Sequence, residues 1–344
     1  MRSKQHLRFA IVGLGSIGRR HLRNLSALGY SDFLAVSRNI CSLPKDDLPA
    51  VQTFEELDAA LSQSPQVVFI CNPSSMHIDT ALKAAQAGCH LFLEKPISHS
   101  LDKVDELSQL VAGKNLCVQV GFQFRFHPLL KKIKTFIAEK TYGKLLSVHA
   151  HWGEYLPGWH PWEDYRQSYS AKNTLGGGVV HTLCHPFDYL RWLVGEVDQL
   201  YASGGKLSSL EIDTEDTALV NLTFSNGTIG SVYLDYVQQS PQHEVRFIFE
   251  KATITWDGLQ NTAKITVDKA TASNYLYIDK NFERNHLFIN EVAAFLRSLQ
   301  QQQDTQCSLK DGIEALRIAL AVKQSMASKR AVRPADIETP MTVS

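Results

Sequence analysis

Residues 7–22 read LRFAIVGLGSIGRRHL, and this stretch decides the fold. It begins at residues 7–14 as an apolar run of the length expected for a buried strand. It continues through Gly13-Leu14-Gly15-Ser16-Ile17-Gly18, the pattern G-x-G-x-x-G, into a helical segment closed by Gly29. A strand, a glycine-rich turn and a helix in this order are typical of the first unit of a dinucleotide-binding Rossmann domain.

The glycines of such a turn have separate roles. Gly13 permits the tight turn, Gly15 lets the backbone approach a pyrophosphate, and Gly18 allows the helix and the strand to pack closely. The unpaired N–H groups and the positive dipole end at the helix N-terminus favour phosphate there. We therefore predict that Gly13, Gly15, Ser16, Ile17 and Gly18 bind a dinucleotide, and the alternative is a glycine-rich turn without a ligand.

The end of the second predicted strand, residues 32–37, bears on the choice between NAD and NADP. A carboxylate about 20 residues after the glycine turn usually accepts hydrogen bonds from the ribose 2′-OH of NAD. This chain has Ser37-Arg38-Asn39 there, without a carboxylate. We predict that Ser37 and Arg38 lie at the ribose and that Arg38 binds the 2′-phosphate of NADP. The alternative is NAD, with Arg38 as a solvated loop residue.

Apolar strands and helical patterns alternate as far as residue 122, at the end of the run LCVQVGF. This alternation indicates βαβ units and a parallel sheet with both faces covered. We assign residues 1–121 to an NAD(P)-binding Rossmann domain with a doubly wound parallel sheet.

After residue 122 the pattern changes. Residues 176–195, GGGVVHTLCHPFDYLRWLVG, predict one long helix that glycines open, and the following segments alternate as antiparallel strands do. Two helical patterns then precede a tail at about residues 334–344. We assign residues 122–344 to an α+β domain for substrate binding and oligomerisation, so that the fold class is α/β plus α+β.

The composition limits the kinds of partner. The 344 residues carry 35 Lys and Arg against 35 Asp and Glu, so no global positive field favours nucleic acid. The six cysteines form no C-x-x-C pair, which is typical of free thiols in a reducing compartment. The N-terminal apolar run lacks a cleavage pattern, and no stretch approaches the roughly 18 apolar residues of a membrane span. We expect a soluble cytoplasmic protein that binds neither nucleic acid nor a membrane.

Residues 71–98, CNPSSMHIDTALKAAQAGCHLFLEKPIS, indicate which family of dinucleotide-binding proteins the chain resembles. With the segment at 176–188 they carry three motifs: Asn72-Pro73 followed by His77, then Glu94-Lys95-Pro96, then three glycines followed by His185-x-x-Asp188. In order and spacing these resemble the glucose–fructose oxidoreductase/inositol dehydrogenase (Gfo/Idh/MocA) family over nearly the whole chain. That family joins an N-terminal Rossmann domain to a C-terminal domain built on a large, open, mostly antiparallel sheet.

The resemblance implies an NAD(P)-dependent dehydrogenase or reductase. Its hydride would pass between the nicotinamide and a secondary alcohol or ketone of a sugar, cyclitol or sugar derivative. It also implies a cis Lys95–Pro96 bond and further cofactor contacts, which are Cys71, Asn72, Pro73, His77, Glu94 and Lys95. As a catalytic group, the Lys95 ammonium would hydrogen-bond the substrate hydroxyl and stabilise its developing negative charge. Without the other motifs, Glu94-Lys95-Pro96 would be only a polar turn with a surface ion pair.

His181, His185 and Asp188 have the spacing of one helix face, and we predict that they point into one cleft. The resemblance makes His185 the general base for the hydroxyl proton. His181 is predicted to belong to the catalytic set with Lys95 and His185. Family members commonly have an aspartate where this chain has His181, so its role is predicted to be binding substrate or orienting a neighbour. A zinc site that uses His181 and His185 with His149, His151 or His160 is the alternative. The pair has no glutamate between its histidines and no third ligand of diagnostic spacing, so we predict no metal.

The segment at 152–170, WGEYLPGWHPWEDYRQSYS, is rich in aromatic residues. Aromatic faces stack on sugar C–H groups while nearby polar groups bind hydroxyls. We predict substrate contacts at Trp159, His160, Trp162 and Arg166, and the alternative is a packing or subunit-contact segment. Arg125 is expected either to face the nicotinamide cleft, as a substrate contact, or to form a structural ion pair.

Two other functions remain open from the sequence. The same fold could serve as a non-catalytic dinucleotide-binding sensor or regulatory protein. Reduction of a non-sugar enal, imine or bilin is a third hypothesis, because related families share the Glu94-Lys95-Pro96 site. We also expect a homodimer or homotetramer that forms through an apolar face of the second sheet.

Overall fold

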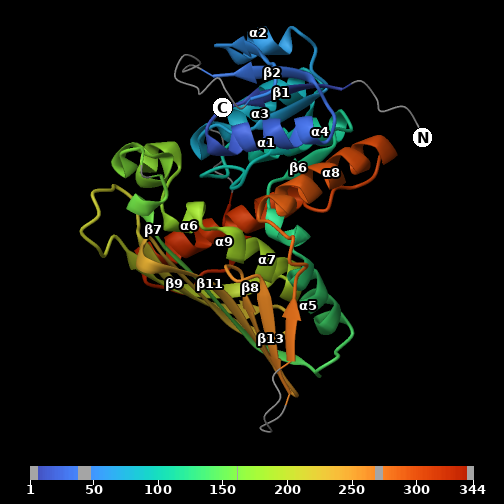
Figure 1. The fold of residues 1–344 in the computed structure, drawn as a ribbon. Helices are drawn as coiled ribbons and strands as arrows, with labels where there is room; N and C mark the ends of the chain where they lie inside the picture. Colours follow the sequence, from blue (N-terminus) through green and yellow to red (C-terminus); the bar gives the residue numbers. More distant parts are fainter. Residues whose placement is uncertain (1–6, 38–47, 161, 268–273, 339–344) are drawn as a thin grey trace. The chain divides into compact units, whose positions relative to one another are not determined.

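The computed structural model describes residues 7–37, 48–160, 162–267 and 274–338 (Figure 1). These residues form two compact units, which are described separately. The first unit contains residues up to 123 together with 283–313, and the second contains 124–282 together with 314–338. One boundary was predicted, at residue 121, whereas in the structure residues 283–313 also belong to the first unit.

The first unit is built on six parallel strands in the order β3-β2-β1-β4-β5-β6, as predicted for a Rossmann domain. The strands are β1 Arg8–Val12, β2 Asp32–Val36, β3 Gln52–Phe54, β4 Val67–Ile70, β5 His90–Leu93 and β6 Val118–Val120. The strand order reverses between β1 and β4, where Val12 lies beside Ile70. Ligands of open α/β sheets bind at such a switch point, beyond the carboxyl ends of the strands.

Among the residues that the structure describes, five α-helices lie within this unit: α1 Ser16–Ala27, α2 Leu57–Leu61, α3 His77–Gln86, α4 Val104–Gly113 and α8 Asn285–Gln301. Val292, Phe295 and Leu296 of α8 belong to the same hydrophobic core as Phe9 and Phe69 of the sheet. Burial of these three side chains against the sheet explains why α8 belongs to the first unit although it lies late in the sequence.

The second unit contains a sheet of eight strands in the order β14-β13-β12-β11-β7-β10-β9-β8. The strands are β7 Leu145–Tyr155, β8 Val197–Gly205, β9 Thr217–Phe224, β10 Ile229–Asp235, β11 Val237–Phe249, β12 Thr253–Asp257, β13 Thr262–Thr266 and β14 Asn274–Tyr277. All neighbours are antiparallel except β7 and β10, which pair in parallel with Ser147 beside Ile229. The mostly antiparallel prediction is confirmed, but β7 lies between β11 and β10, so the sheet is not a simple meander.

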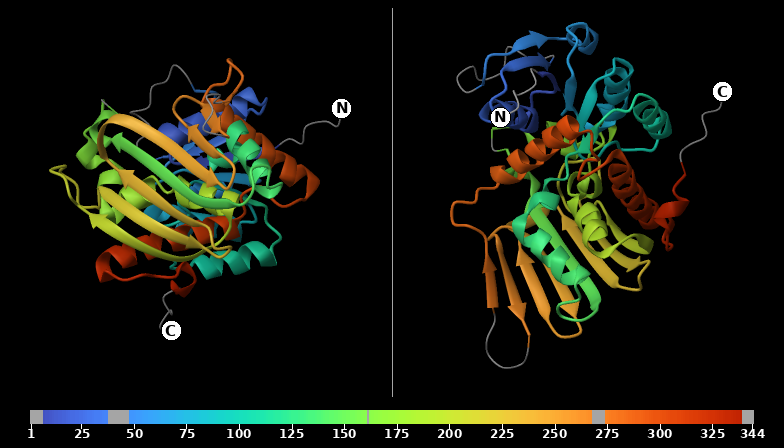
Figure 2. Two further views of the ribbon diagram at one scale, coloured as in Figure 1. Left: turned by 90° about the horizontal axis from the view of Figure 1, so that it is seen from below. Right: turned by 90° about the vertical axis from the view of Figure 1, so that its right-hand side faces the viewer.

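One face of this sheet is covered by helices (Figure 2). They are α5 Pro128–Ala138, α6 Val179–Thr182, α7 His185–Val194 and the greater part of α9 Leu309–Ser328. Among the described residues no helix of this unit covers the other face, which is mixed rather than apolar. Cross-strand pairing sets one row of side chains across it: Tyr201, Asn221, Ser231, His149, Arg246, Thr255, Lys264 and Tyr275.

The described part of the predicted unstructured tail, residues 334–338, is structured. Val332 pairs with Leu200 by backbone hydrogen bonds of 2.8 Å in both directions, and a 3₁₀ turn, η9, follows at Pro334–Asp336. Pro334 is buried, so this part of the predicted tail is packed against the protein. None of the described helices combines the length and the apolar character that crossing a membrane requires.

Candidate active site

Two glycines of the turn after β1 are required by close backbone contacts. Gly13 has a φ of +90°, and a Cβ there would lie 2.7 Å from the Asn72 nitrogen. A Cβ on Gly18 would overlap the Gly13 oxygen, because the start of α1 packs directly against the turn. A Cβ on Gly15 would meet no described atom within 4 Å. The turn is therefore closed on its protein side and open at Gly15, as a pyrophosphate site requires.

Ser37 follows β2 at the position predicted to select the cofactor. It is half-buried, and its N–H donates to the Phe54 oxygen at 3.0 Å. Arg38 lies outside the described residues, so its predicted contact with a 2′-phosphate stays a prediction.

The residues after β4 form a tightly bonded loop, in which a 3₁₀ turn, η3 Ser74–Met76, leads into α3. Cys71 is buried, and burial raises the pKa of its thiol well above the usual range. His77 is also buried, with Nδ1 2.8 Å from the Pro96 oxygen and Nε2 2.7 Å from the Asn72 oxygen. Burial lowers the pKa of His77, although both backbone contacts oppose this. The His77 ring thus joins two backbone segments, and neither ring nitrogen faces outward to a cofactor.

Lys95 follows β5 and precedes Pro96, and the Lys95–Pro96 bond is cis, as the resemblance implied. Lys95 is half-buried, whereas Glu94 and Pro96 on either side are buried. The Glu94 carboxylate accepts a hydrogen bond from His21 Nε2 at 2.7 Å and a longer one from the Lys95 N–H at 3.3 Å. Burial would raise the pKa of Glu94, but the His21 hydrogen bond and nearby positive charge outweigh it and hold that pKa below its usual value. Glu94 was predicted to contact the cofactor, yet its carboxylate is bound inside the first unit.

The prediction of one continuous helix over residues 176–195 is wrong. The segment forms two helices, α6 and α7, separated by Leu183 and Cys184. Pro186 explains the break, because it has no N–H and its ring would clash with the Thr182 carbonyl in a continuous helix. His181 and His185 therefore do not share one helix face at i, i+4 spacing.

His185 begins α7 in a buried aromatic environment. Its ring lies edge-to-face with Phe124 at 5.0 Å and stacks on Trp152 at 5.5 Å. Trp152 also stacks on His243 at 4.1 Å, and His243 Nε2 lies 3.3 Å from the Tyr189 hydroxyl. His243 was not among the predicted site residues. The available signal was its place in β11, where it lies on the same face as the buried apolar residues Val245 and Phe247.

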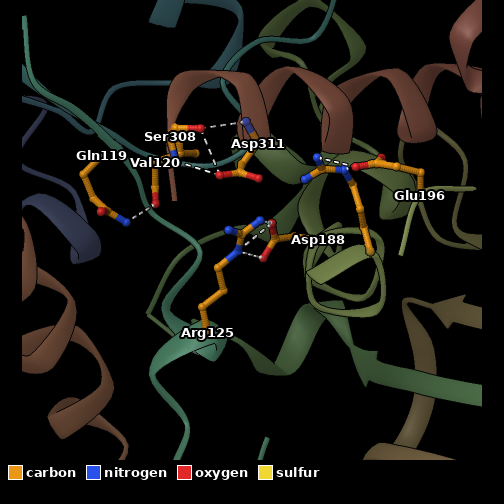
Figure 3. A network of polar contacts seen from close by, with 8 residues as sticks. Gln119, Val120, Arg125, Asp188, Glu196, Ser308 and Asp311 are labelled. Atoms are coloured by element: carbon orange, nitrogen blue, oxygen red, sulfur yellow. Dashed lines mark hydrogen bonds and ion pairs between the residues drawn. The ribbon is translucent and has the colours of Figure 1, made fainter. Parts of the chain in front are cut away.

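Asp188 binds Arg125 rather than facing outward beside His185 (Figure 3). Arg125 lies in a 3₁₀ turn, η4 Gln123–Phe126, and donates to Asp188 through Nε at 3.0–3.1 Å and Nη2 at 2.6 Å. The two side chains are only 4% and 1% exposed. Of the two expectations for Arg125, this geometry favours the structural ion pair over a substrate contact.

The predicted substrate segment, residues 152–170, begins in β7 and continues through 3₁₀ turns: η5 Leu156–Gly158, η6 Tyr165–Gln167 and the start of η7 Tyr169–Ala171. Arg166 is exposed and pairs with Asp164 and Glu211, and its hydrogen bonds to them raise its pKa. Trp162 is 73% exposed. The other two residues are half-buried: His160 contacts the Trp162 ring, and Trp159 packs edge-on against Tyr236. The segment thus holds exposed aromatic and paired charged groups, and their contact with substrate stays a prediction.

Within the described ranges no three His, Cys, Asp or Glu side chains are grouped to hold a metal ion. Two histidines of the zinc alternative lie on the open face of the second sheet. His149 hydrogen-bonds Ser231 at 2.8 Å, and His151 hydrogen-bonds Gln238 at 2.8 Å.

The fold and the glycine turn define a protein with a dinucleotide-binding Rossmann unit. Residues 7–122 match the model described as "Oxidoreductase family, NAD-binding Rossmann fold", and residues 130–255 match "GFO/IDH/MocA C-terminal domain". A Bacillus subtilis relative, "Uncharacterized oxidoreductase YrbE", is 31% identical over 92% of this chain and 93% of its own length. The chain belongs to the Gfo/Idh/MocA family.

Other relatives carry named activities. A "Myo-inositol 2-dehydrogenase" of Thermotoga maritima is 26% identical over 95% of this chain and 98% of that protein. A solved structure titled "Levoglucosan dehydrogenase, complex with NADH" has a TM-score of 0.84 at 19% identity, covering 96% of this chain and 99% of that one. At this identity the structural likeness establishes the fold alone.

Proposed function

We propose that this protein is a dehydrogenase or reductase that acts on a secondary alcohol or ketone of a sugar, cyclitol or sugar derivative. One observation of the first unit carries the proposal. Val12, Ile70 and Leu93 end three neighbouring strands in register. The glycine turn, the loop at Asn72 and the half-buried Lys95 therefore follow at the same edge of the sheet. An amine beside a dinucleotide turn suits polarisation of a substrate oxygen.

The proposed reaction separates a hydride from a proton. Bound NAD(P) supplies the hydride acceptor or donor, which is chemistry that protein side chains lack. In the oxidation direction, the Lys95 ammonium donates a hydrogen bond to the substrate oxygen and stabilises its negative charge. His185 accepts the hydroxyl proton and returns it in the reduction direction. His181 is proposed to bind substrate, together with Trp159, His160, Trp162 and Arg166.

Replacement of Lys95 tests this proposal. Lys95→Met is expected to lower kcat by at least 100-fold and to leave the cofactor Kd within about threefold, because the lost hydrogen bond acts in the transition state. Lys83→Met is the matched control, since Lys83 is an exposed lysine of the same unit that pairs with Asp58. Full activity of Lys95→Met would refute the assignment. If the wild type turns over none of a panel of polyols and sugars with either cofactor, the sensor hypothesis is favoured instead.

We propose that NADP is preferred over NAD. Ser37-Arg38-Asn39, directly after β2, contains no carboxylate, and Arg38 offers a cation for the 2′-phosphate. Titration of protein fluorescence is expected to give a lower Kd for NADPH than for NADH, and Arg38→Ala is expected to reduce the difference. Tenfold tighter binding of NADH would overturn this preference.

We also propose a homodimer or homotetramer that assembles through the open face of the second sheet. That face exposes Tyr201, Leu219 and Ile229 among polar residues. Light scattering after size exclusion is expected to give two or four chains, and Leu219→Lys is expected to shift the mass towards one. A monomeric wild type would refute this. Cys71, Cys89 and Cys117 are free thiols, in keeping with our proposal of a cytoplasmic location, which cell fractionation would test.

A further inference from the structure

Glu94 and His21 form a hydrogen-bonded pair inside the aromatic core of the first unit. His21 lies on α1, three residues after Gly18, and its side chain is fully buried, while that of Glu94 is 8% exposed. The His21 ring centroid lies 4.8 Å from that of Phe92 and 5.2 Å from that of Phe69. Its Nδ1 is buried and has no hydrogen-bond partner among the described residues. The single hydrogen bond of this ring therefore goes to Glu94.

Burying such a polar pair in a core costs free energy. Removing two polar side chains from water costs several kcal/mol, and apolar side chains of similar volume are often at least as stabilising. A role other than stability would explain why this core contains a histidine and a glutamate.

The Glu94 carboxylate touches the backbone that carries Lys95. Its Oε2 accepts the Lys95 N–H at 3.3 Å, and a Cβ on Gly121 would lie 3.0–3.1 Å from the carboxylate. Gly121 therefore leaves the space that Glu94 occupies after β6. The carboxylate is fixed on one side by His21 of α1 and on the other by the loop that presents Lys95.

A second histidine holds the residue on the other side of Lys95. His77 Nδ1 lies 2.8 Å from the Pro96 oxygen, while its Nε2 lies 2.7 Å from the Asn72 oxygen. The half-buried Lys95 thus stands between two buried neighbours, each bonded to a buried histidine. One histidine comes from the helix that begins at the glycine turn, and the other comes from the start of α3.

We propose that Glu94, His21 and His77 are positioning residues that hold the Lys95 backbone relative to the glycine turn. This inference rests on the proposed function of Lys95 and replaces the earlier prediction that Glu94 and His77 bind the cofactor directly. The two roles predict different kinetics. A cofactor ligand affects the cofactor Kd, whereas a positioning residue affects kcat through the orientation of Lys95.

The variants Glu94→Gln and His21→Met test the proposal in the full chain. Each is expected to lower kcat at least tenfold while the Kd for NADPH and NADH changes less than threefold. His21→Gln keeps an amide donor and is expected to recover at least a third of the activity. The double variant is expected to have a kcat no lower than that of Glu94→Gln alone, because the two single variants and the double variant all lose the same Glu94–His21 hydrogen bond. His90→Gln is the matched control, since His90 begins β5 at the opposite end of the strand and contacts the Cys117 N–H.

A measurement without turnover separates this proposal from the proposed function. After reductive ¹³C-methylation, the NMR signal of Lys95, assigned with Lys95→Arg, is expected to differ from that of exposed lysines. In Glu94→Gln and His21→Met the Lys95 signal should move towards the chemical shift of exposed lysines, and in His90→Gln it should not move. An unmoved signal would overturn the positioning role even in an inactive protein. A tenfold weaker cofactor Kd with unchanged kcat, or a lowered Tm as the only effect, would overturn it as well.

Discussion

Breaking the Arg125–Asp188 pair gives the strongest stability prediction for the second unit. The two side chains are 4% and 1% exposed and share hydrogen bonds of 2.6–3.1 Å. Asp188→Asn would leave a buried guanidinium without its compensating charge. Loss of one partner of a buried pair costs about 3–5 kcal/mol, so we expect the free energy of unfolding to fall by that amount. Replacement of both residues, as in Arg125→Met with Asp188→Leu, is expected to restore most of the loss.

Tryptophan fluorescence during urea unfolding is the appropriate assay. All five tryptophans, at positions 152, 159, 162, 192 and 256, belong to the second unit, so their signal reports the unfolding of that unit. Arg333→Met is the matched control, because Arg333 pairs with Asp198 in the same unit but the two are 57% and 45% exposed. An exposed pair contributes about 0–1 kcal/mol.

Two outcomes would refute this reasoning. If Asp188→Asn cost no more than Arg333→Met, the buried pair would not have the importance that its geometry implies. If Arg125→Met left the unfolding free energy unchanged and raised KM for the substrate, Arg125 would be a substrate contact after all.

Two further predictions concern the glycine turn and acid stability. Gly15→Ala should weaken NADPH binding at least tenfold with an unchanged Tm, since its Cβ meets no described atom but would enter the space reserved for the pyrophosphate. Gly113→Ala is the control, because a Cβ there also meets no described atom. Equal NADPH affinities of the two variants would refute the placement of the pyrophosphate at Gly15. Burial lowers the pKa of His127 from 6.5 to about 4. The contribution of neutral His127 to stability is therefore complete above pH 6.5. It is lost as the pH falls from 6.5 towards 4, because in that range the unfolded chain binds a proton at His127 and the folded protein does not. Between pH 7 and 5 the loss is about 2 kcal/mol, and His127→Gln should remove that part of the pH dependence in urea titrations.

The features predicted best from the sequence are those that residues close together in the chain determine. The run from residue 7 to Gly18 specifies its strand, turn and helix locally, and the parallel sheet was found as predicted. The break between α6 and α7 was also readable, because Pro186 stands in the sequence where a continuous helix needs an N–H.

Contacts between distant residues were beyond the sequence. Arg125 and Asp188 are 63 residues apart, and His21 and Glu94 are 73 apart. In each case the sequence contains the charged groups but does not identify the partner, because the pairing depends on how strands and helices assemble. The insertion of β7 beside β10 is a similar case, since a parallel neighbour is not signalled by a turn.

The contribution of α8 to the first core has a consequence for how the protein is made. During synthesis, residues up to 123 leave the ribosome long before Val292, Phe295 and Leu296 exist to cover their side of Phe69 and Phe92. Until α8 is synthesised, after the whole second sheet, the nascent dinucleotide-binding unit exposes the apolar surface that α8 covers in the folded protein. Such a chain is expected to depend on chaperones at this stage. For the same reason, expression of residues 1–123 alone should yield an aggregating fragment.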